Sequence, residues 1–227
     1  MTIFALEAMD LAALLCSRVC HDVISPVGAI INGLEVLEDE KDPAMRQIAL
    51  DLIKKSAASA SARLQFCRLA YGAAGSVGAS IDTGDAESVT RGLITNERTK
   101  LVWNGVRQHA PKNKVKLVLN LCLIALAAIP RGGVVTVDLT GEGDKMAARV
   151  EARGTNARLA HGVAALIDGH PEAGGVDAHT IQAFYTGLVG RDCGMEISVA
   201  VEPEFVLLNA QPIVKTAAVE ASLDRSA

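Results

Sequence analysis

Aromatic residues are scarce in this 227-residue chain, because Phe, Trp and Tyr together make up only 3% of it, whereas hydrophobic residues of all kinds make up 50%. A hydrophobic core therefore has to be assembled from Ala, Leu, Val and Ile side chains. The chain also lacks an excess of positive charge, since its formal net charge is -4 and its Lys and Arg residues are scattered. This charge balance argues against bulk binding to nucleic acid.

Long hydrophobic runs and paired cysteines are missing as well. One of the longest apolar segments, LVLNLCLIALAAIP, has about half the length that spanning a bilayer requires. The N-terminus lacks basic residues, and Glu7 and Asp10 interrupt its apolar stretch, so we expect no signal peptide. The five cysteines are odd in number and include no Cys-x-x-Cys pair, which favours a reducing compartment. We expect a cytoplasmic protein that binds no membrane.

The two halves of the chain differ in pattern. Residues 1–74 predict two long helices, and in the break between them Asp42 can cap the second helix while Pro43 takes its first position. A glycine-rich linker follows, and residues 80–212 mix strand and helix patterns. Residues 213–227 predict a loose tail. The predicted fold class is α+β, with a helical hairpin followed by an α/β sandwich domain.

Within the second half, a helix is predicted for KNKVKLVLNLCLIALAAIP, which ends at Pro130. Two further helical segments are predicted near residues 156–167 and 177–193. Strands are predicted for TKLVWNG, for a hairpin in GGVVTVDLTGEGDKMAARVEA, and for a closing pair in MEISVAVEPEFVLLNA.

His21 lies in the middle of the first predicted helix, beside Asp22 and ahead of Pro26. When the helix is unrolled at about 100° per residue, an apolar stripe lies opposite the histidine. Small or polar residues share the histidine's own lane, so we expect its ring to face solvent. Pro26 costs roughly 3 kcal/mol in mid-helix, which suggests a place that another molecule approaches. A plain solvated helix face is the alternative. The apolar stripe comprises Ala12, Cys16, Val19, Val23, Pro26, Ile30, Leu34 and Leu37.

A hairpin of two helices cannot bury such a stripe by itself. Four helices around a common core can, and a second copy of the chain supplies the other two. We therefore expect a homodimer whose four-helix bundle carries two outward-facing histidines. On the second helix, the run SAASASA at residues 56–62 indicates either close helix packing or clearance for a docking partner, and the two are compatible.

The segment HDVISPVGAIINGLEVL resembles the phosphoacceptor segment of histidine kinases, in which His, an acidic residue, three further residues and Pro precede an apolar helix. The second half is similar to a kinase ATP-binding domain of the Bergerat type, although its nucleotide site is degenerate. Ile124 stands four residues after Asn120, where the kinases hold magnesium with a second asparagine, and it offers no oxygen ligand. Ala152 stands near the position of the adenine-binding aspartate, and GGVDAHTIQAFYTGL lacks the glycine-rich lid.

A kinase-like hairpin with a degenerate ATPase-like domain resembles the ChpT-type histidine phosphotransferases, which SPVGAIINGLEVLED and AIPRGGVVTV also match. The resemblance implies a phosphorelay intermediate. It would take a phosphoryl group from the receiver domain of a hybrid histidine kinase and pass it to response regulators that control the cell cycle. The chain itself would bind no cofactor or metal, since Mg²⁺ would come with the receiver. Two alternatives stay open, namely an ATP-dependent histidine kinase core and a non-catalytic dimerisation or regulator-binding module.

His21 is the predicted nucleophile, because a neutral imidazole offers a free lone pair near pH 7. Arg18 lies about one turn earlier and Arg63 is expected opposite, so that one of them screens the phosphoryl charge. Asp22 occupies the position that orients the ring or acts as a base in kinases. The resemblance implies that receivers dock below the histidine, on Ser25, Gly28, Ile31, Asn32 and Glu35. The other histidines share no metal-like spacing and are expected at the surface; they are His109, His161, His170 and His179.

Overall fold

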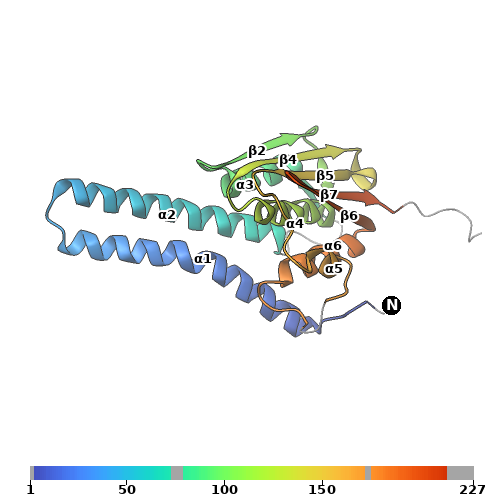
Figure 1. Cartoon of the computed structure of the whole chain (residues 1–227), viewed down its shortest axis with the longest axis horizontal. Coiled ribbons are helices and arrows are strands. Elements are labelled where there is room, and N and C mark those ends of the chain that lie inside the picture. The colour runs from blue at the N-terminus through green and yellow to red at the C-terminus, as the bar shows by residue number, and fades with distance from the viewer. Residues whose placement is uncertain (1–2, 73–78, 172–174, 214–227) are drawn as a thin grey trace, which may run out of the picture.

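The structure is a computed structural model that describes residues 3–72, 79–171 and 175–213. Figure 1 shows a long helical hairpin that projects from one side of an α/β domain. The hairpin consists of α1 (Ala8–Asp39) and α2 (Pro43–Ala70). Both the predicted hairpin and the α+β class are confirmed. The predicted tail and most of the predicted linker lie outside the described residues. The α/β domain contains β1 (Ser80–Asp82), α3 (Thr83–Ile94), β2 (Thr99–Asn104), β3 (His109–Pro111), α4 (Lys112–Ala128), β4 (Gly133–Thr140), η1 (Gly143–Lys145), β5 (Ala147–Arg153), α5 (Val163–Ile167), α6 (Ile181–Asp192), β6 (Met195–Glu202) and β7 (Phe205–Pro212).

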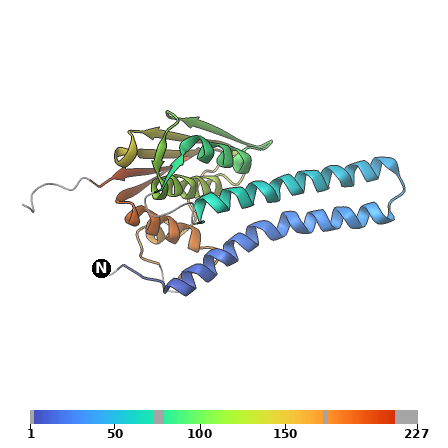
Figure 2. The same ribbon diagram turned by 180° about the vertical axis from the view of Figure 1, so that it is seen from behind.

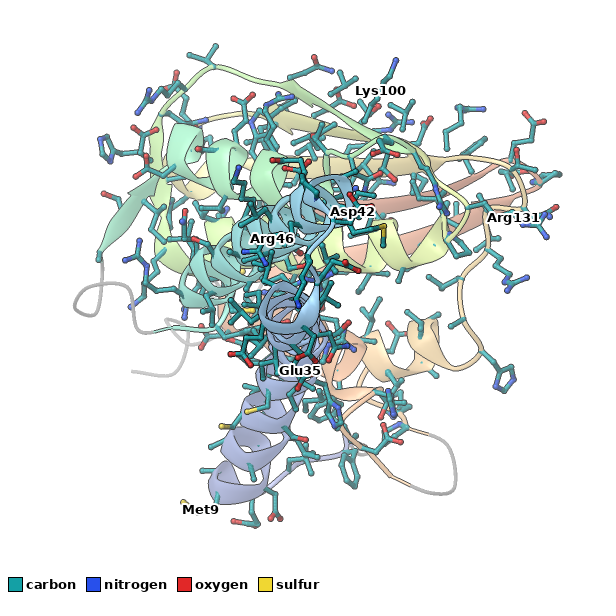
Figure 3. The ribbon with its side chains drawn as sticks, turned by 90° about the vertical axis from the view of Figure 1, so that its left-hand side faces the viewer. Met9, Glu35, Asp42, Arg46, Lys100 and Arg131 are labelled. Carbon is teal, nitrogen blue, oxygen red and sulfur yellow. The ribbon has the colours of Figure 1, made fainter. Side chains whose placement is uncertain are left out.

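The tip of the hairpin is closed by capping at both helix ends. The Asp42 carboxylate accepts a hydrogen bond from the backbone N–H of Ala44 at 3.0 Å, and Pro43 takes the first position of α2, as predicted. The carbonyl oxygens at the end of a helix have no N–H partner within the helix. Here the Arg46 guanidinium donates to two of them, those of Leu37 and Glu40. Figure 3, which views the molecule from this end, shows Asp42 and Arg46 close to each other.

The two hairpin helices approach closely where small residues meet. Gly33 is the single buried residue of α1, and a Cβ atom built on it would lie only 2.7 Å from Cγ1 of Ile53 on α2. Ala49, whose carbonyl oxygen also faces Gly33, is buried on α2 together with Ser56 and Ala60. Seven- and eleven-residue steps return to nearly the same side of a helix, so these small residues share one face. The run at 56–62 therefore contributes to close helix packing.

The α/β domain is a two-layer sandwich. Its five-stranded sheet has the order β2-β4-β5-β7-β6, in which β2 and β4 are parallel and the other neighbours are antiparallel. Helices cover one face of this sheet, and the largely buried α4 lies between it and the hairpin base (Figures 1 and 2). The strands alternate buried and exposed residues, and exposed ion pairs such as Arg149 to Asp138 lie on the other face. The predicted strands and sandwich are confirmed.

One helix was not predicted, and one helix prediction is wrong in part. Helix α3 was not predicted, because its buried side includes Thr83 and Thr90, which interrupt the apolar pattern; the Asp82 carboxylate caps it by accepting from the N–H of Gly84. The helix predicted near residues 156–167 is wrong over its first part. Asn156 has a left-handed backbone with φ of 58°, and only Val163–Ile167 is helical.

Among the described residues, α1 is the one helix long and apolar enough to cross a bilayer by length and composition. None of the residues in its most apolar window is buried within the chain. In the structure this helix runs antiparallel to α2 and contacts α6 at its base, so it is part of the folded unit (Figure 2). Its exposed apolar residues therefore call for an explanation that the single chain does not supply.

Candidate functional site

His21 lies near the middle of α1 and is exposed, as predicted. The helix continues through Pro26 without a break. Because the following residues Ser25 and Asn32 are exposed as well, the ring stands on an open strip of helix surface. An exposed imidazole in this setting is accessible to a second protein.

Arg18 and Asp22 form an ion pair within one turn of the same helix, with 3.3 Å between Nε and Oδ2. Their side chains are only 27% and 23% exposed, because both line a cavity of about 230 Å³ between the hairpin and the α/β domain. Arg63 lines the same cavity, and its Nε atom is buried without a hydrogen-bond partner. The structure thus brings the three predicted charged residues together around one cavity, with the Asp22 carboxylate held by Arg18.

The same cavity contains Cys67 of α2. Burial, reinforced by the negative charge of Asp22, raises the pKa of this thiol to about 11, while Arg18 and Arg63 oppose the shift. The Cys67 thiol is consequently protonated and a poor nucleophile near neutral pH. The exposed imidazole of His21 is therefore a better nucleophile than the Cys67 thiol.

The predicted docking residues extend from His21 towards the hairpin tip. Ser25, Asn32 and Glu35 are exposed, and Ile31 has 52% of its surface exposed. A Cβ atom built on Gly28 would meet no atom within 4 Å. Figure 3 shows Glu35 on the hairpin, near the end that faces the viewer. These residues form an open strip that a partner can contact, and their role in docking stays a prediction.

His179 belongs to the site, although the sequence analysis predicts only a surface position for it. Its ring stacks on that of His21, with ring centroids 6.2 Å apart and an angle of 30° between the planes. The residue lies in the turn before α6, where the Asp177 carboxylate accepts hydrogen bonds from the N–H groups of His179 and Thr180 at 2.9 and 2.8 Å. No local motif links two residues so far apart in the sequence, so only the folded chain reveals this pair.

The positions that hold magnesium and adenine in kinases carry different chemistry here. Asn120 is fully buried, and its amide donates to the carbonyl oxygens of Lys116 and Ala70 and accepts from Gln182. Ile124 is 5% exposed and apolar, and Ala152 is fully buried in β5. These residues do not fit a magnesium–nucleotide complex. In the described part of the chain, no group of three or more His, Cys, Asp or Glu side chains could hold a metal ion.

Asn120 instead joins the hairpin to the α/β domain. Its partner Gln182 accepts a hydrogen bond from the Tyr71 hydroxyl at the end of α2. Burial is the main cause that raises the pKa of Tyr71 above its usual range. Just before α1, Phe4 packs edge-to-face on Phe184 of α6, with centroids 5.8 Å apart. Both ends of the hairpin are therefore anchored, which fixes α1 against the turn that carries His179.

The chain is similar to known phosphotransferases in both sequence and structure. Residues 83–205 match the family model described as the histidine phosphotransferase C-terminal domain. The chain is 47% identical over 206 residues to the protein phosphotransferase ChpT of Brucella abortus (strain 2308), which covers 91% of this chain and 97% of that protein. A solved 1.7 Å structure of a bacterial phosphotransferase superposes with a TM-score of 0.85 at 44% identity, over 92% of this chain and all of that one.

The family model spans more than half of the 227 residues, and the relative from Brucella abortus aligns over nearly its whole length. These similarities support a phosphoryl carrier of two-component phosphorelays rather than an ATP-dependent kinase, so that alternative is set aside. The chain belongs to the ChpT-type family of histidine phosphotransferases.

Proposed function

We propose that His21 is the phosphoacceptor of this phosphotransferase. It receives the phosphoryl group from the aspartyl phosphate of a hybrid histidine kinase receiver and passes it to response regulators that control the cell cycle. The observation that carries the proposal is the exposed imidazole in the middle of α1, on a helix surface open to a second protein. Membership of the family supports phosphotransfer in general.

The chemistry asks little of the chain beyond a free and oriented imidazole. The unprotonated ring nitrogen attacks phosphorus in line, forming a P–N bond while the P–O bond to the aspartate breaks and the carboxylate departs. The proton on the other ring nitrogen stays in place or is released to water. The reverse sequence phosphorylates the aspartate of the next receiver. We propose that Mg²⁺ is brought by the receiver and that this chain binds no cofactor.

Arg18 is better placed than Arg63 to offset the phosphoryl charge. Arg18 lines both the cavity shared with Arg63 and a second cavity of about 250 Å³, which is also lined by His179, whose ring contacts that of His21. Arg63 lines only the first of these two, and its Nε atom is buried. Asp22 then acts through Arg18, by fixing the position of the guanidinium.

A second copy of the chain is proposed to cover the apolar surface of the hairpin. On α1, Ile24, Val27 and Leu34 are 66%, 40% and 48% exposed, and on α2 Ile48 is 61% exposed. A two-helix hairpin with exposed apolar residues on both helices is expected to pair into a four-helix bundle. Dimerisation also accounts for the apolar composition of α1 without a bilayer. We accordingly propose a homodimer in the cytoplasm.

Phosphoryl transfer from a receiver tests the role of His21. The full chain is mixed with receiver domains from hybrid kinases of the same organism, labelled on their aspartate, and acid-labile, base-stable label is measured on the chain. We expect label on the wild type and on His109→Ala, whose histidine lies exposed in β3, and none on His21→Ala. Label that persists on His21→Ala would refute the assignment.

The docking strip is tested with Gly28→Trp. The side chain enters open space, so the fold is expected to persist while the bulky ring blocks the receiver and transfer is lost. Gly28→Ala is the matched control and should transfer normally. Normal transfer by the Trp variant would remove Gly28, and the neighbouring Ser25 and Asn32, from the proposed interface with receivers.

A further inference from the structure

We propose that His179 of the α/β domain is a positioning residue, which holds the imidazole of His21 in its reactive orientation by packing its own ring beside that imidazole. This inference rests on the proposed role of His21 as phosphoacceptor. It assigns a task to the α/β domain, whose nucleotide positions have lost their ligands.

The geometry suits restraint without obstruction. The ring centroids of His21 and His179 are 6.2 Å apart and their planes are inclined by 30°, within the range in which aromatic rings attract one another. The lone pair of an imidazole nitrogen lies in the plane of the ring. Because nearly parallel rings with centroids this far apart are offset, His179 limits rotation of the His21 ring from one side, while the exposed side of the ring stays open to phosphorus.

His179 is itself held in place by a short turn. The Asp177 carboxylate accepts from the N–H groups of His179 and Thr180 and, at 2.7 Å, from the Thr180 hydroxyl. Hydrogen bonds from Thr180 lead the causes that lower the pKa of Asp177, so its carboxylate is charged and a strong acceptor at neutral pH. The turn runs directly into α6, whose Gln182 is tied to the buried Asn120. His179 is therefore mounted on a rigid element.

A freely rotating exposed histidine has to be ordered each time a receiver arrives, whereas a stacked ring is ordered beforehand. Holding the acceptor in position raises the rate of the chemical step more than it changes the binding of the donor. That distinction separates positioning from docking, because loss of a docking contact weakens donor binding instead.

The experiment uses phosphoramidate as a small donor, so that no receiver contact contributes. The full chain is incubated with increasing phosphoramidate, and acid-labile phosphohistidine is followed over time. We expect His179→Ala to lower the maximal rate by about tenfold, with little change in the half-saturating concentration. His179→Phe keeps a flat ring and should stay within about twofold of the wild type. His109→Ala, which removes an exposed histidine of β3, is the control and should behave as wild type.

Asp177→Ala tests the support beneath the ring. It should slow labelling as His179→Ala does, and the double variant should be no slower than either single variant, because both remove the same restraint. Ring-to-ring nuclear Overhauser contacts between His21 and His179 in the wild type give a second measurement that needs no phosphodonor. Their absence, or a His179→Ala variant labelled within twofold of the wild-type rate, would overturn the inference. Label that persists on His21→Ala would instead refute the proposed function, which keeps the two failures apart.

Discussion

The hairpin and the α/β domain are both rich in apolar residues, yet they use them differently. The 32-residue helix α1 buries only Gly33, whereas the 17-residue helix α4 buries most of its length, including Leu117, Leu119 and Leu121. The domain completes its core together with Phe66 and Ala70 at the base of α2, while the rest of the hairpin leaves apolar residues exposed. The difference teaches that the base of the hairpin belongs to the folded core, whereas the rest of the hairpin offers apolar surface to other molecules.

The largest expected effect is a loss of stability when the core of the α/β domain is changed. Phe184 is fully buried on α6, so Phe184→Ala should lower the free energy of unfolding by about 3–5 kcal/mol through lost burial and a cavity. Leu64→Ala, at a position of α2 that is 50% exposed, should cost less than about 1 kcal/mol. Urea denaturation measures both values, and equal losses would contradict the contrast between the two regions.

The next effect concerns the open face of the hairpin. In Leu34→Asp a charge enters the apolar surface proposed to pair with a second copy, so we expect the dimer dissociation constant to rise by about a hundredfold. Lys54→Asp introduces the same charge at an exposed polar position of α2 and should leave the dimer intact. Analytical ultracentrifugation measures the constants. An unaltered dimer in Leu34→Asp would place the interface elsewhere.

Two glycines of α1 lie on different sides of the helix, since Gly33 faces α2 and Gly28 faces open space. Gly33→Ala places a Cβ atom 2.7 Å from Ile53, and should destabilise the chain by about 1–3 kcal/mol. Gly28→Ala meets no atom within 4 Å, so its better helix propensity should stabilise by up to about 1 kcal/mol. Thermal melts give the order of the two variants, and the reverse order would show that the packing of α1 on α2 differs.

The smallest expected effect is a difference in alkylation rate between cysteines of the two regions. Cys16 and Cys20 on the hairpin are exposed and should react first at pH 8. Burial raises the pKa of Cys122 to about 12 and of Cys67 to about 11. Because the thiolate is the reactive form, the rate at Cys67 should stay low and rise by about tenfold per pH unit between pH 8 and 10. Mass spectrometry follows each site. Rapid labelling of Cys122 at pH 8 would contradict its place in the core.

Much of this arrangement could be predicted from the sequence, because the signals were local. The Asp42–Pro43 start of α2, the exposed lane of His21 and the closing strand pair each follow from the spacing of neighbouring residues. Helix α3 escaped prediction because buried threonines blur its periodicity. The helix predicted near residues 156–167 was too long, since a left-handed Asn156 precedes the short helix.

The site itself was predictable only in part. Arg18 and Asp22 share the helix of His21, so their proximity follows from helical spacing. His179 lies in a distant turn and reaches His21 only because α6 packs beside the base of α1. Contacts of this kind depend on how elements dock, which the pattern of a single segment does not encode. The residue with the least sequence signal is thus one whose ring contacts the proposed phosphoacceptor.

The most direct test of the central claim is to locate the phosphoryl group on the wild-type chain. After transfer from a labelled receiver, the chain is digested at neutral pH and fragmented by electron transfer, which retains the P–N bond. The proposed function predicts that the phosphoryl group sits on the imidazole of His21. A phosphoryl group found on any other side chain, with His21 unmodified, would contradict it.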